Sequence, residues 1–276
     1  MSLDFDIVVF SHLRWNWVYQ RPQHLLTRLA RHHRVWYIEE PVKVENEDYG
    51  LEVEGVAPNL SVVRPLLRAD YPFFVGDQIP PLTALAKRLI AEHRIEPLAY
   101  WLYTPMALPV AQAFEPVAVV YDCMDELSAF RFAPPELLER ETRLLAWADV
   151  VFTGGPSLYR AKAGRHANVH CFPSSIDKAH FRRALDAGLQ DPADQAPIPH
   201  PRLGYFGVID ERLDYDLLGS LAQARPDWQI VMVGPLAKVN PEDLPHASNI
   251  HYLGQRPYED LPAYISGWDV ALMPFA

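Results

Sequence analysis

Short apolar runs alternate with amphipathic segments of helix length along most of the chain. Residues Asp6–Ser11 form a mainly apolar run of the kind found in buried parallel strands. The next segment, Pro22–Arg31, places Leu25, Leu26 and Leu29 on one helical face. Repeated strand and helix units of this kind predict a parallel sheet that is covered by helices on both faces.

The same alternation continues to about residue 172. The predicted strands are Val35–Ile38, Ser61–Arg64, Leu98–Tyr103, Val117–Tyr121, Asp149–Thr153 and Val169–Phe172. The predicted helices are Pro81–His93, Pro135–Trp147 and Pro156–Ala163. We therefore expect a first α/β domain of ordinary size over residues 1–185.

A second alternation follows a segment that has no periodicity. Residues 186–202 are rich in Pro, Ala, Asp and Gln, which predicts a linker. The strands predicted after it are Leu203–Phe206, Gln229–Val233, Ile250–Leu253 and Val270–Met273, and the helices are Asp214–Ala224 and Tyr258–Ser266. The chain ends inside an apolar run, so we expect residues 203–276 to be an incomplete second α/β domain.

Composition and charge exclude several classes of protein. The net charge of −10 argues against nucleic-acid binding, which requires clustered Lys and Arg. The sequence contains neither an apolar run long enough to span a membrane nor a signal-peptide pattern. The two cysteines, Cys123 and Cys171, do not have the spacing of a zinc site or a disulfide framework, and no carboxylate cluster is built for a metal. We expect a cytoplasmic protein without a bound metal or cofactor.

The loop after the first predicted strand is the first candidate site. Ligands of open α/β sheets bind beyond the carboxyl ends of the strands. This loop carries His12, Arg14, Trp15, Gln20 and Arg21, side chains that suit a sugar and a phosphate. Packing of Trp15 beneath the loop is the alternative for that ring. His12 is the one histidine that we single out as a candidate catalytic residue.

Two carboxylates follow the strand at Val117–Tyr121. Asp122 and Asp125 lie where a strand ends, and a carboxylate there can accept hydrogen bonds from sugar hydroxyls or take a proton from an acceptor hydroxyl. Capping of the following turn is the alternative for each of them. We expect Asp125 to be the more directly catalytic of the two.

Several strings along the chain resemble the GT-B glycosyltransferases, in particular those of bacterial cell-surface polysaccharides. The first domain carries SHLRWNWVYQRPQHLLTRLA from Ser11, YDCMDELSAF from Tyr121, VVFTGGPSLYRAK from Val150 and FPSSID from Phe172. The second carries YFGVIDERLDYDLL from Tyr205 and GQRPYEDLPAYISGWDVALMPFA from Gly254. The resemblance implies two Rossmann-like parallel-sheet domains that face a cleft, with the second domain truncated.

The same resemblance implies a function. It is that of a retaining enzyme that moves a sugar from a UDP- or GDP-linked donor to a glycan or lipid-linked acceptor, in the cytoplasm or at the inner face of the membrane. Donor binding falls to Gly207, Arg212 and Gly234 of the second domain, and Arg14, Trp15, Gln20 and Arg21 line the acceptor and phosphate side. Arg212 is the one basic residue between Tyr205 and Leu218, and neutralisation of its acidic neighbours is the alternative reading of it.

Two other functions are compatible with these patterns. A nucleotide-sugar epimerase of GT-B type has the same domains but needs no separate acceptor. A non-catalytic GT-B-like module is favoured by the low basic content around Arg212. The fold alone does not decide between them.

Overall fold

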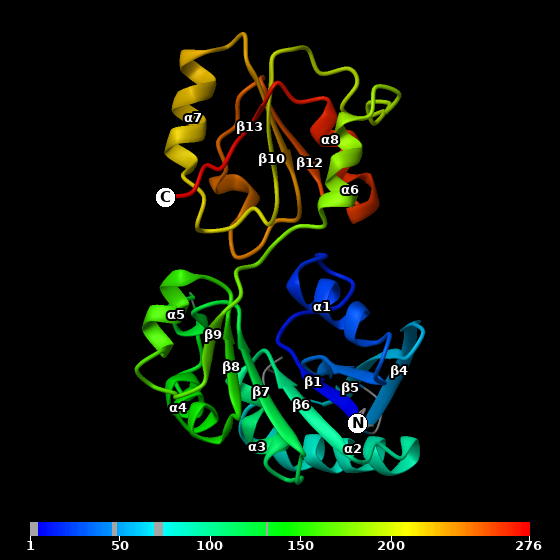
Figure 1. Cartoon of the computed structure of the whole chain (residues 1–276). Helices are drawn as coiled ribbons and strands as arrows, with labels where there is room; N and C mark the ends of the chain where they lie inside the picture. The colour runs from blue at the N-terminus through cyan, green and yellow to red at the C-terminus, as the bar shows by residue number, and fades with distance from the viewer. Residues whose placement is uncertain (1–4, 46–48, 69–73, 131) are drawn as a thin grey trace. The chain divides into compact units, whose positions relative to one another are not determined.

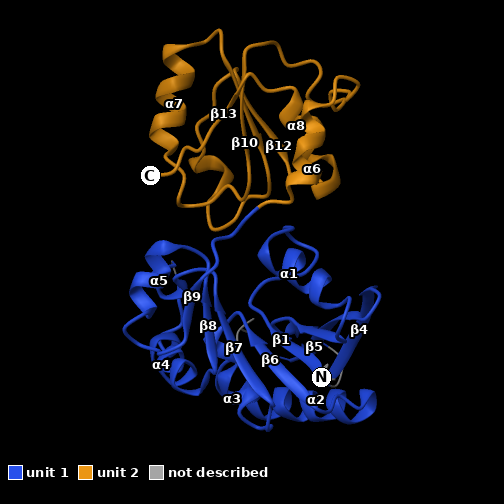
Figure 2. Ribbon diagram, viewed as in Figure 1, with its two compact units in different colours: residues 1–175 blue, residues 176–276 orange. Residues whose placement is uncertain are grey.

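The structure is a computed structural model that describes residues 5–45, 49–68, 74–130 and 132–276. The chain divides into two compact units, Met1–Ser175 and Ile176–Ala276 (Figure 2). Each unit has its own sheet and its own apolar core. The α/β class and the parallel sheets that the sequence predicts are confirmed.

The first unit is built on a sheet of nine strands, as far as the described residues show, in the order β3-β5-β2-β1-β6-β7-β8-β9 with β4 beside β5. The strands are β1 Asp6–Phe10, β2 Val35–Ile38, β3 Val42–Lys43, β4 Gly50–Ala57, β5 Leu60–Leu67, β6 Leu98–Leu102, β7 Ala118–Cys123, β8 Val150–Thr153 and β9 Val169–Cys171. Every pairing is parallel except that of β4 with β5. The chain proceeds from β1 first to β2 on one side and later to β6 on the other, so β1 ends at the switch point of the sheet.

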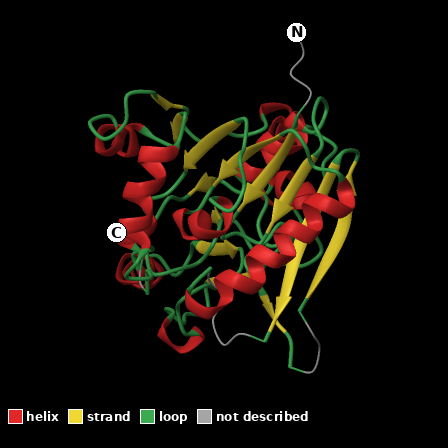
Figure 3. Cartoon of the chain, turned by 90° about the horizontal axis from the view of Figure 1, so that it is seen from below, coloured by secondary structure: helices red, strands yellow, loops and turns green. Residues whose placement is uncertain are grey.

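Helices cover both faces of this sheet, and Figure 3 shows them beside the strands. The helices are α1 Arg21–Leu29, α2 Ile79–His93, α3 Leu108–Ala111, α4 Leu137–Trp147 and α5 Pro156–Lys162. Alternate residues of β1 belong to two different cores. Val9 packs with Leu26 of α1, and Phe10 packs with residues of α2, α3 and α4. This alternation follows from the two-residue period of a strand.

The second unit has a smaller parallel sheet in the order β12-β11-β10-β13. Its elements are α6 Lys178–Arg182, β10 Arg202–Phe206, α7 Tyr215–Ala224, β11 Gln229–Val233, β12 Ile250–Gly254, α8 Leu261–Ser266 and β13 Val270–Ala271. Figure 1 shows α7 and α8 on opposite sides of these strands. Leu218 and Ala222 of α7 pack on one face, and Tyr264 of α8 packs on the other.

Some elements have no clear signal in the sequence. Strand β4 is mostly exposed and pairs antiparallel with β5 at the margin of the sheet, so no apolar alternation marks it. The short strand β3 and the short helices α3 and α6 are likewise not predicted. Short 3-10 turns occupy Gly76–Gln78, Pro105–Ala107, Leu127–Ala129, Arg183–Leu185, Pro241–Asp243 and Tyr258–Asp260.

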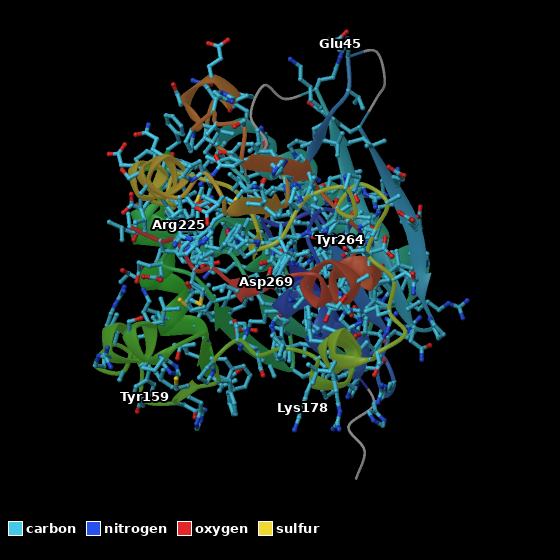
Figure 4. All side chains as sticks on the ribbon, turned by 90° about the horizontal axis from the view of Figure 1, so that it is seen from above. Glu45, Tyr159, Lys178, Arg225, Tyr264 and Asp269 are labelled. Atoms are coloured by element: carbon cyan, nitrogen blue, oxygen red, sulfur yellow. The ribbon has the colours of Figure 1, made fainter. Side chains whose placement is uncertain are left out.

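The expected linker at residues 186–202 belongs to the second unit instead, and the division between the units comes earlier, after Ser175. Gln195 is fully buried, and its side-chain amide donates to the carbonyl of Tyr264 at 3.0 Å and accepts from the indole of Trp268 at 2.8 Å. Ile198 packs with Tyr264, which is labelled in Figure 4. The two partners of Gln195 lie 69 and 73 positions later in the chain. Because such tertiary contacts leave no periodicity in the sequence, the segment was predicted to be a linker.

Helix α7 begins with a side-chain cap that gives a direct stability prediction. Asp214 Oδ1 accepts from the main-chain N–H of Leu217 at 2.8 Å. Replacement of Asp214 by Ala leaves that N–H without its cap and is expected to lower the free energy of unfolding of the second unit by about 1 kcal/mol. Asp214→Ser should keep most of the stability in urea unfolding, and equal losses for Ala and Ser would contradict a capping role.

Candidate functional site

The candidate residues of the first unit lie at the carboxyl edge of its sheet. Strands β1, β6 and β7 are neighbours and parallel, so the segments that follow them emerge at the same edge. The loop from Ser11 to Gln20 follows β1, Asp122 lies within the end of β7, and Asp125 follows it. The structure therefore places both predicted groups of residues at one edge, next to the switch point at β1.

Arg21 and Asp122 form a buried ion pair. Arg21 Nε lies 3.0 Å from each carboxylate oxygen of Asp122, and Arg21 Nη2 lies 2.8 Å from Oδ1. The indole of Trp101 donates to Asp122 Oδ2 at 3.2 Å, and Arg21 Nη1 donates to the carbonyl of Phe172 at 2.7 Å. The side chain of Arg21 is 7% exposed and that of Asp122 is 0% exposed. The pair braces helix α1 against the centre of the sheet and against the end of β9.

This burial affects the chemistry of Asp122. Burial raises the pKa of its carboxyl, and the hydrogen bonds and charge of Arg21 oppose that rise. Because its oxygens already accept from Arg21 and Trp101, the geometry explains Asp122 as a structural brace. A catalytic role for Asp122 stays a prediction. Asp125 is only half-buried, which keeps it the more accessible carboxylate of the two.

The segment around Asp125 is held in place by ion pairs of a buried lysine. Lys162 of α5 is almost fully buried and lies 2.9 Å from a carboxylate oxygen of Glu126 and 2.7 Å from one of Glu141. Glu141 in turn accepts from the hydroxyl of Tyr121 at 3.0 Å and pairs with Arg165 at 2.7 Å. The loop that carries Asp125 is thus tied through its neighbour Glu126 to helices α4 and α5.

The loop after β1 is held by Glu39, a residue that the sequence analysis missed. Glu39 Oε1 accepts from the main-chain N–H of Trp15 at 2.6 Å, and Oε2 lies 3.2 Å from Arg14 Nη1 and 3.3 Å from Arg64 Nε. Arg14 Nη2 also donates to the carbonyl of Pro41 at 3.0 Å. The signal was present, because Glu39 directly follows a buried strand just as Asp122 ends one.

The other predicted residues of this loop lie in mixed surroundings. Trp15 packs edge-on against Tyr37 with ring centroids 5.0 Å apart, so its ring belongs to the core beneath the loop. The main-chain N–H of Gln20 donates to the side chain of Gln23 at the start of α1, at 3.0 Å. His12 is half-buried in the same loop. The binding and catalytic roles of these residues remain predictions.

A second carboxylate lies beside Glu39 at this edge. Glu40 is 8% exposed, and burial raises the pKa of its carboxyl to about 8, against the opposing charge of Arg14. A carboxyl with that pKa is mostly protonated at neutral pH, so it can donate a hydrogen bond.

The carboxyl edge of the second sheet depends on two glycines. Gly207 follows β10 with φ of +149°, and Gly234 follows β11 with φ of +154°. A Cβ placed on Gly234 would lie 1.8 Å from the carbonyl oxygen of Gly207, so only glycine allows the two backbones to approach this closely. Both residues were predicted to bind the donor. The structure shows why glycine is required there, and the binding role remains a prediction.

The loops after β10 and β11 are joined along their backbones. Ile209 donates to the carbonyl of Pro235 at 2.9 Å, and Ala237 donates to the carbonyl of Ile209 at 3.0 Å. These bonds bring Lys238, which follows β11, to the loop of Arg212. Lys238 Nζ lies 3.8 Å from Glu211 Oε1, and Arg212 pairs with Asp210. Sequence reasoning missed Lys238 because only the pairing of β10 with β11 brings it to the loop that carries Arg212.

Two further findings bear on the site. In residues 5–45, 49–68, 74–130 and 132–276 there is no group of three His, Cys, Asp or Glu side chains that could hold a metal ion. Within the same residues no helix has both the length and the apolar character that crossing a membrane requires.

Comparison with known proteins gives one curated relative and many structural neighbours. No protein-family model matches the chain. TuaH of Bacillus subtilis, assigned as a glycosyltransferase of teichuronic acid biosynthesis, is 24% identical over 177 residues, which are 57% of this chain and 43% of TuaH. The match thus spans less than half of that relative.

Two solved structures show the fold. Sucrose-phosphate synthase of Thermosynechococcus elongatus aligns with a TM-score of 0.69 at 16% identity, over 99% of this chain and 77% of that one. HepE of Anabaena, solved in complex with UDP-glucose, aligns with a TM-score of 0.62 at 15% identity, over 96% of this chain and 72% of that one. The chain therefore has the α/β fold of the GT-B glycosyltransferases, with a parallel sheet in each of its two units.

Proposed function

We propose that this chain belongs to a glycosyltransferase that moves a sugar from a nucleotide-diphosphate donor to a glycan or lipid-linked acceptor in the synthesis of a surface polysaccharide. Two comparisons support it: the likeness to TuaH, and a fold shared with an Anabaena protein solved with UDP-glucose. We place the enzyme in the cytoplasm, or at the inner face of the membrane when the acceptor is lipid-linked. The donor we infer is linked to UDP or GDP, without a separate cofactor.

The observation that carries the proposal is the pair of basic side chains at the carboxyl edge of the second sheet. Arg212 and Lys238 lie on two loops that are hydrogen-bonded to each other, next to Gly207 and Gly234. Their side chains are 49% and 39% exposed, so a ligand in solvent can reach both. Guanidinium and ammonium groups at such an edge suit a diphosphate, and they stabilise the charge that develops on it as the sugar departs.

The acceptor side of the proposal rests on the first unit. Its candidate edge carries the half-buried carboxylate of Asp125 and the half-buried His12. In the proposed reaction either group takes the proton of the acceptor hydroxyl as that hydroxyl attacks the anomeric carbon. The bond between the sugar and the nucleotide diphosphate breaks, and the diphosphate leaves with the bonding electrons. Retention of configuration at the sugar is part of this proposal. It requires that the bond to the diphosphate breaks first to give an oxocarbenium-like sugar, which the acceptor hydroxyl then attacks on the face that the diphosphate leaves.

Arginine substitutions in the second unit test the donor assignment. Arg212→Ala is expected to weaken the binding of UDP or GDP at least tenfold, because a charge-assisted contact to the diphosphate is lost. Arg225, labelled in Figure 4, is a matched control, because it also pairs with the aspartate two residues away from it, Asp227, and lies outside the candidate edge. Isothermal titration calorimetry on both variants should show a change only for Arg212→Ala, and equal effects would contradict the assignment.

Product analysis separates the proposed transferase from a nucleotide-sugar epimerase. A transferase releases the nucleoside diphosphate only when an acceptor is present, apart from slow hydrolysis. An epimerase alters its donor without any acceptor. Formation of an epimeric nucleotide sugar from donor alone would replace the transferase assignment.

A further inference from the structure

The loop Asp210–Asp214 carries three acidic residues around Arg212, and the structure gives each acidic residue a different partner. Asp210 pairs with Arg212, Glu211 lies 3.8 Å from Lys238, and Asp214 caps helix α7. In the sequence this acidic content counts against a diphosphate site. In the structure the first two carboxylates each contact one of the two cations that the proposed function assigns to the donor.

We propose that Asp210 is a positioning residue that holds the guanidinium of Arg212 in the orientation that receives the donor diphosphate. The inference rests on the proposed function, because it takes Arg212 as a ligand of the diphosphate. It adds a residue that does not itself contact the donor.

The contacts of Asp210 support an orienting role. Arg212 Nε lies 3.0 Å from Oδ1 and 3.1 Å from Oδ2 of Asp210, and Arg212 Nη2 lies 2.7 Å from Oδ2. The main-chain N–H of Arg212 also donates to Oδ1, at 3.1 Å. Asp210 therefore holds Arg212 by its backbone and by one edge of its guanidinium, which fixes the plane of the group.

Asp210 is itself held rigidly. Its side chain is 9% exposed, whereas that of Arg212 is 49% exposed. The carbonyl of Asp210 accepts from the hydroxyl of Tyr215 at 2.8 Å and from the main-chain N–H of Leu213 at 3.1 Å. A fixed carboxylate beneath a solvent-accessible guanidinium restricts a long side chain before any ligand arrives. Restriction of that kind reduces the ordering cost of binding.

Charge balance explains why orientation matters at this edge. Asp210, Glu211, Arg212 and Lys238 carry a formal charge of zero together, so long-range attraction by this group is small. Affinity for a diphosphate must then come from short, well-directed contacts of the guanidinium. Loss of the Asp210 carboxylate adds net positive charge yet is expected to weaken binding. If Asp210 only neutralises the charge of Arg212, loss of its carboxylate should instead strengthen diphosphate binding.

The test compares an acidic residue of this loop, Asp210, with an acidic residue of the helix that follows it, Asp216. Asp210→Asn is expected to weaken the binding of UDP or GDP about tenfold in calorimetry, since one guanidinium edge loses its carboxylate. Asp216 is exposed in the first turn of α7, and Asp216→Asn makes the same change of charge as a control. We expect that control to bind as the unsubstituted chain does.

A double-mutant cycle separates orientation from a general structural effect. Arg212→Lys retains a positive charge but has no planar group for a carboxylate to orient. In that background Asp210→Asn should cause no further loss of affinity. Additive losses in the cycle would overturn the inference, since they would place the effect of Asp210 on some other part of the loop.

The outcomes distinguish this inference from the proposed function. If Arg212→Ala weakens nucleotide binding while Asp210→Asn leaves it unchanged or strengthens it, the role of Asp210 is rejected and the donor site stands. If the unsubstituted chain binds neither UDP nor GDP, or if Arg212→Ala has no effect, both are rejected. A loss for Asp210→Asn that disappears in the Arg212→Lys background supports both.

Discussion

Asp122→Ala is expected to lower the free energy of unfolding of the first unit by about 3–5 kcal/mol. The substitution removes the carboxylate and leaves the guanidinium of Arg21, whose side chain is 7% exposed, buried without its counter-charge. It also removes the acceptor of the Trp101 indole. Urea unfolding that follows the tryptophan fluorescence of this unit measures the loss.

Two further variants sharpen this prediction. Glu139→Ala removes an exposed carboxylate from α4 of the same unit and should change the stability by less than about 0.5 kcal/mol. The double variant Arg21→Met with Asp122→Leu removes both charges and should recover much of the loss. A loss for Asp122→Ala no larger than that for Glu139→Ala would contradict the buried pair. A stable Asp122→Asn variant without turnover would instead favour a catalytic Asp122.

Lys162→Met is the second substitution with a large expected effect, a loss of about 3–5 kcal/mol at neutral pH. Methionine fills similar space but leaves Glu126 and Glu141 without the ammonium group that lies 2.9 Å and 2.7 Å from them. Lys87→Met, at an exposed position on α2, is the matched control and should be nearly neutral. Calorimetric or urea unfolding of both variants provides the comparison.

The pH dependence of this cluster has a defined sign. Burial opposes the charged form of Glu141, but hydrogen bonds from Lys162 and Arg165 outweigh it and lower the pKa below the ordinary value of 4.5. Stability from this carboxylate is therefore present above about pH 4.5 and lost as the pH falls through the folded-state pKa. Burial also disfavours charged Lys162, but the hydrogen bonds with Glu141 and Glu126 prevail and raise its pKa above 10.5.

The lysine contribution is thus complete below pH 10.5 and lost as the pH rises through its folded-state pKa. Between pH 4.5 and pH 10.5 the ion pairs of Lys162 with Glu126 and Glu141 therefore contribute a constant amount to the free energy of unfolding. Lys162→Met should make the free energy of unfolding depend less on pH at acid pH. The difference in stability between the variant and the unsubstituted chain should therefore shrink below pH 4.5. If the difference in the free energy of unfolding between the two proteins stays constant down to pH 3, it does not come from the ion pairs of Lys162.

Much of the fold was predictable because its strands are buried on both faces. Runs such as Asp6–Ser11 and Gln229–Val233 are apolar without alternation, and helices with one apolar face follow them. The positions of Asp122 and Asp125 at a strand end could be predicted for the same reason. Strand β4 could not, because its exposed residues carry no apolar pattern and its antiparallel pairing depends on β5.

The location of the candidate site could be predicted from the sequence, but most of its side-chain contacts could not. Arg21 and Asp122 were both singled out, but their pairing joins residues 101 positions apart and could not be predicted. The catalytic role of Asp122 and the acceptor-side role of Arg21 stay predictions. Glu39 was missed although its position directly after a buried strand gave the same signal as that of Asp122. Lys238 was missed because only the pairing of β10 with β11 brings it to the loop of Arg212. Segment 186–202 belongs to the second unit for a related reason, since the side chain of Gln195 finds partners on and after α8.

Calorimetric titration of the chain with UDP, GDP and ADP measures whether the second unit binds the diphosphate of a nucleotide-sugar donor. We expect UDP or GDP to bind at one site, and the double variant Arg212→Ala with Lys238→Ala to abolish this binding while the chain remains folded by circular dichroism. Absence of binding by all three nucleotides, or unchanged binding by the double variant, would contradict donor binding by the second unit.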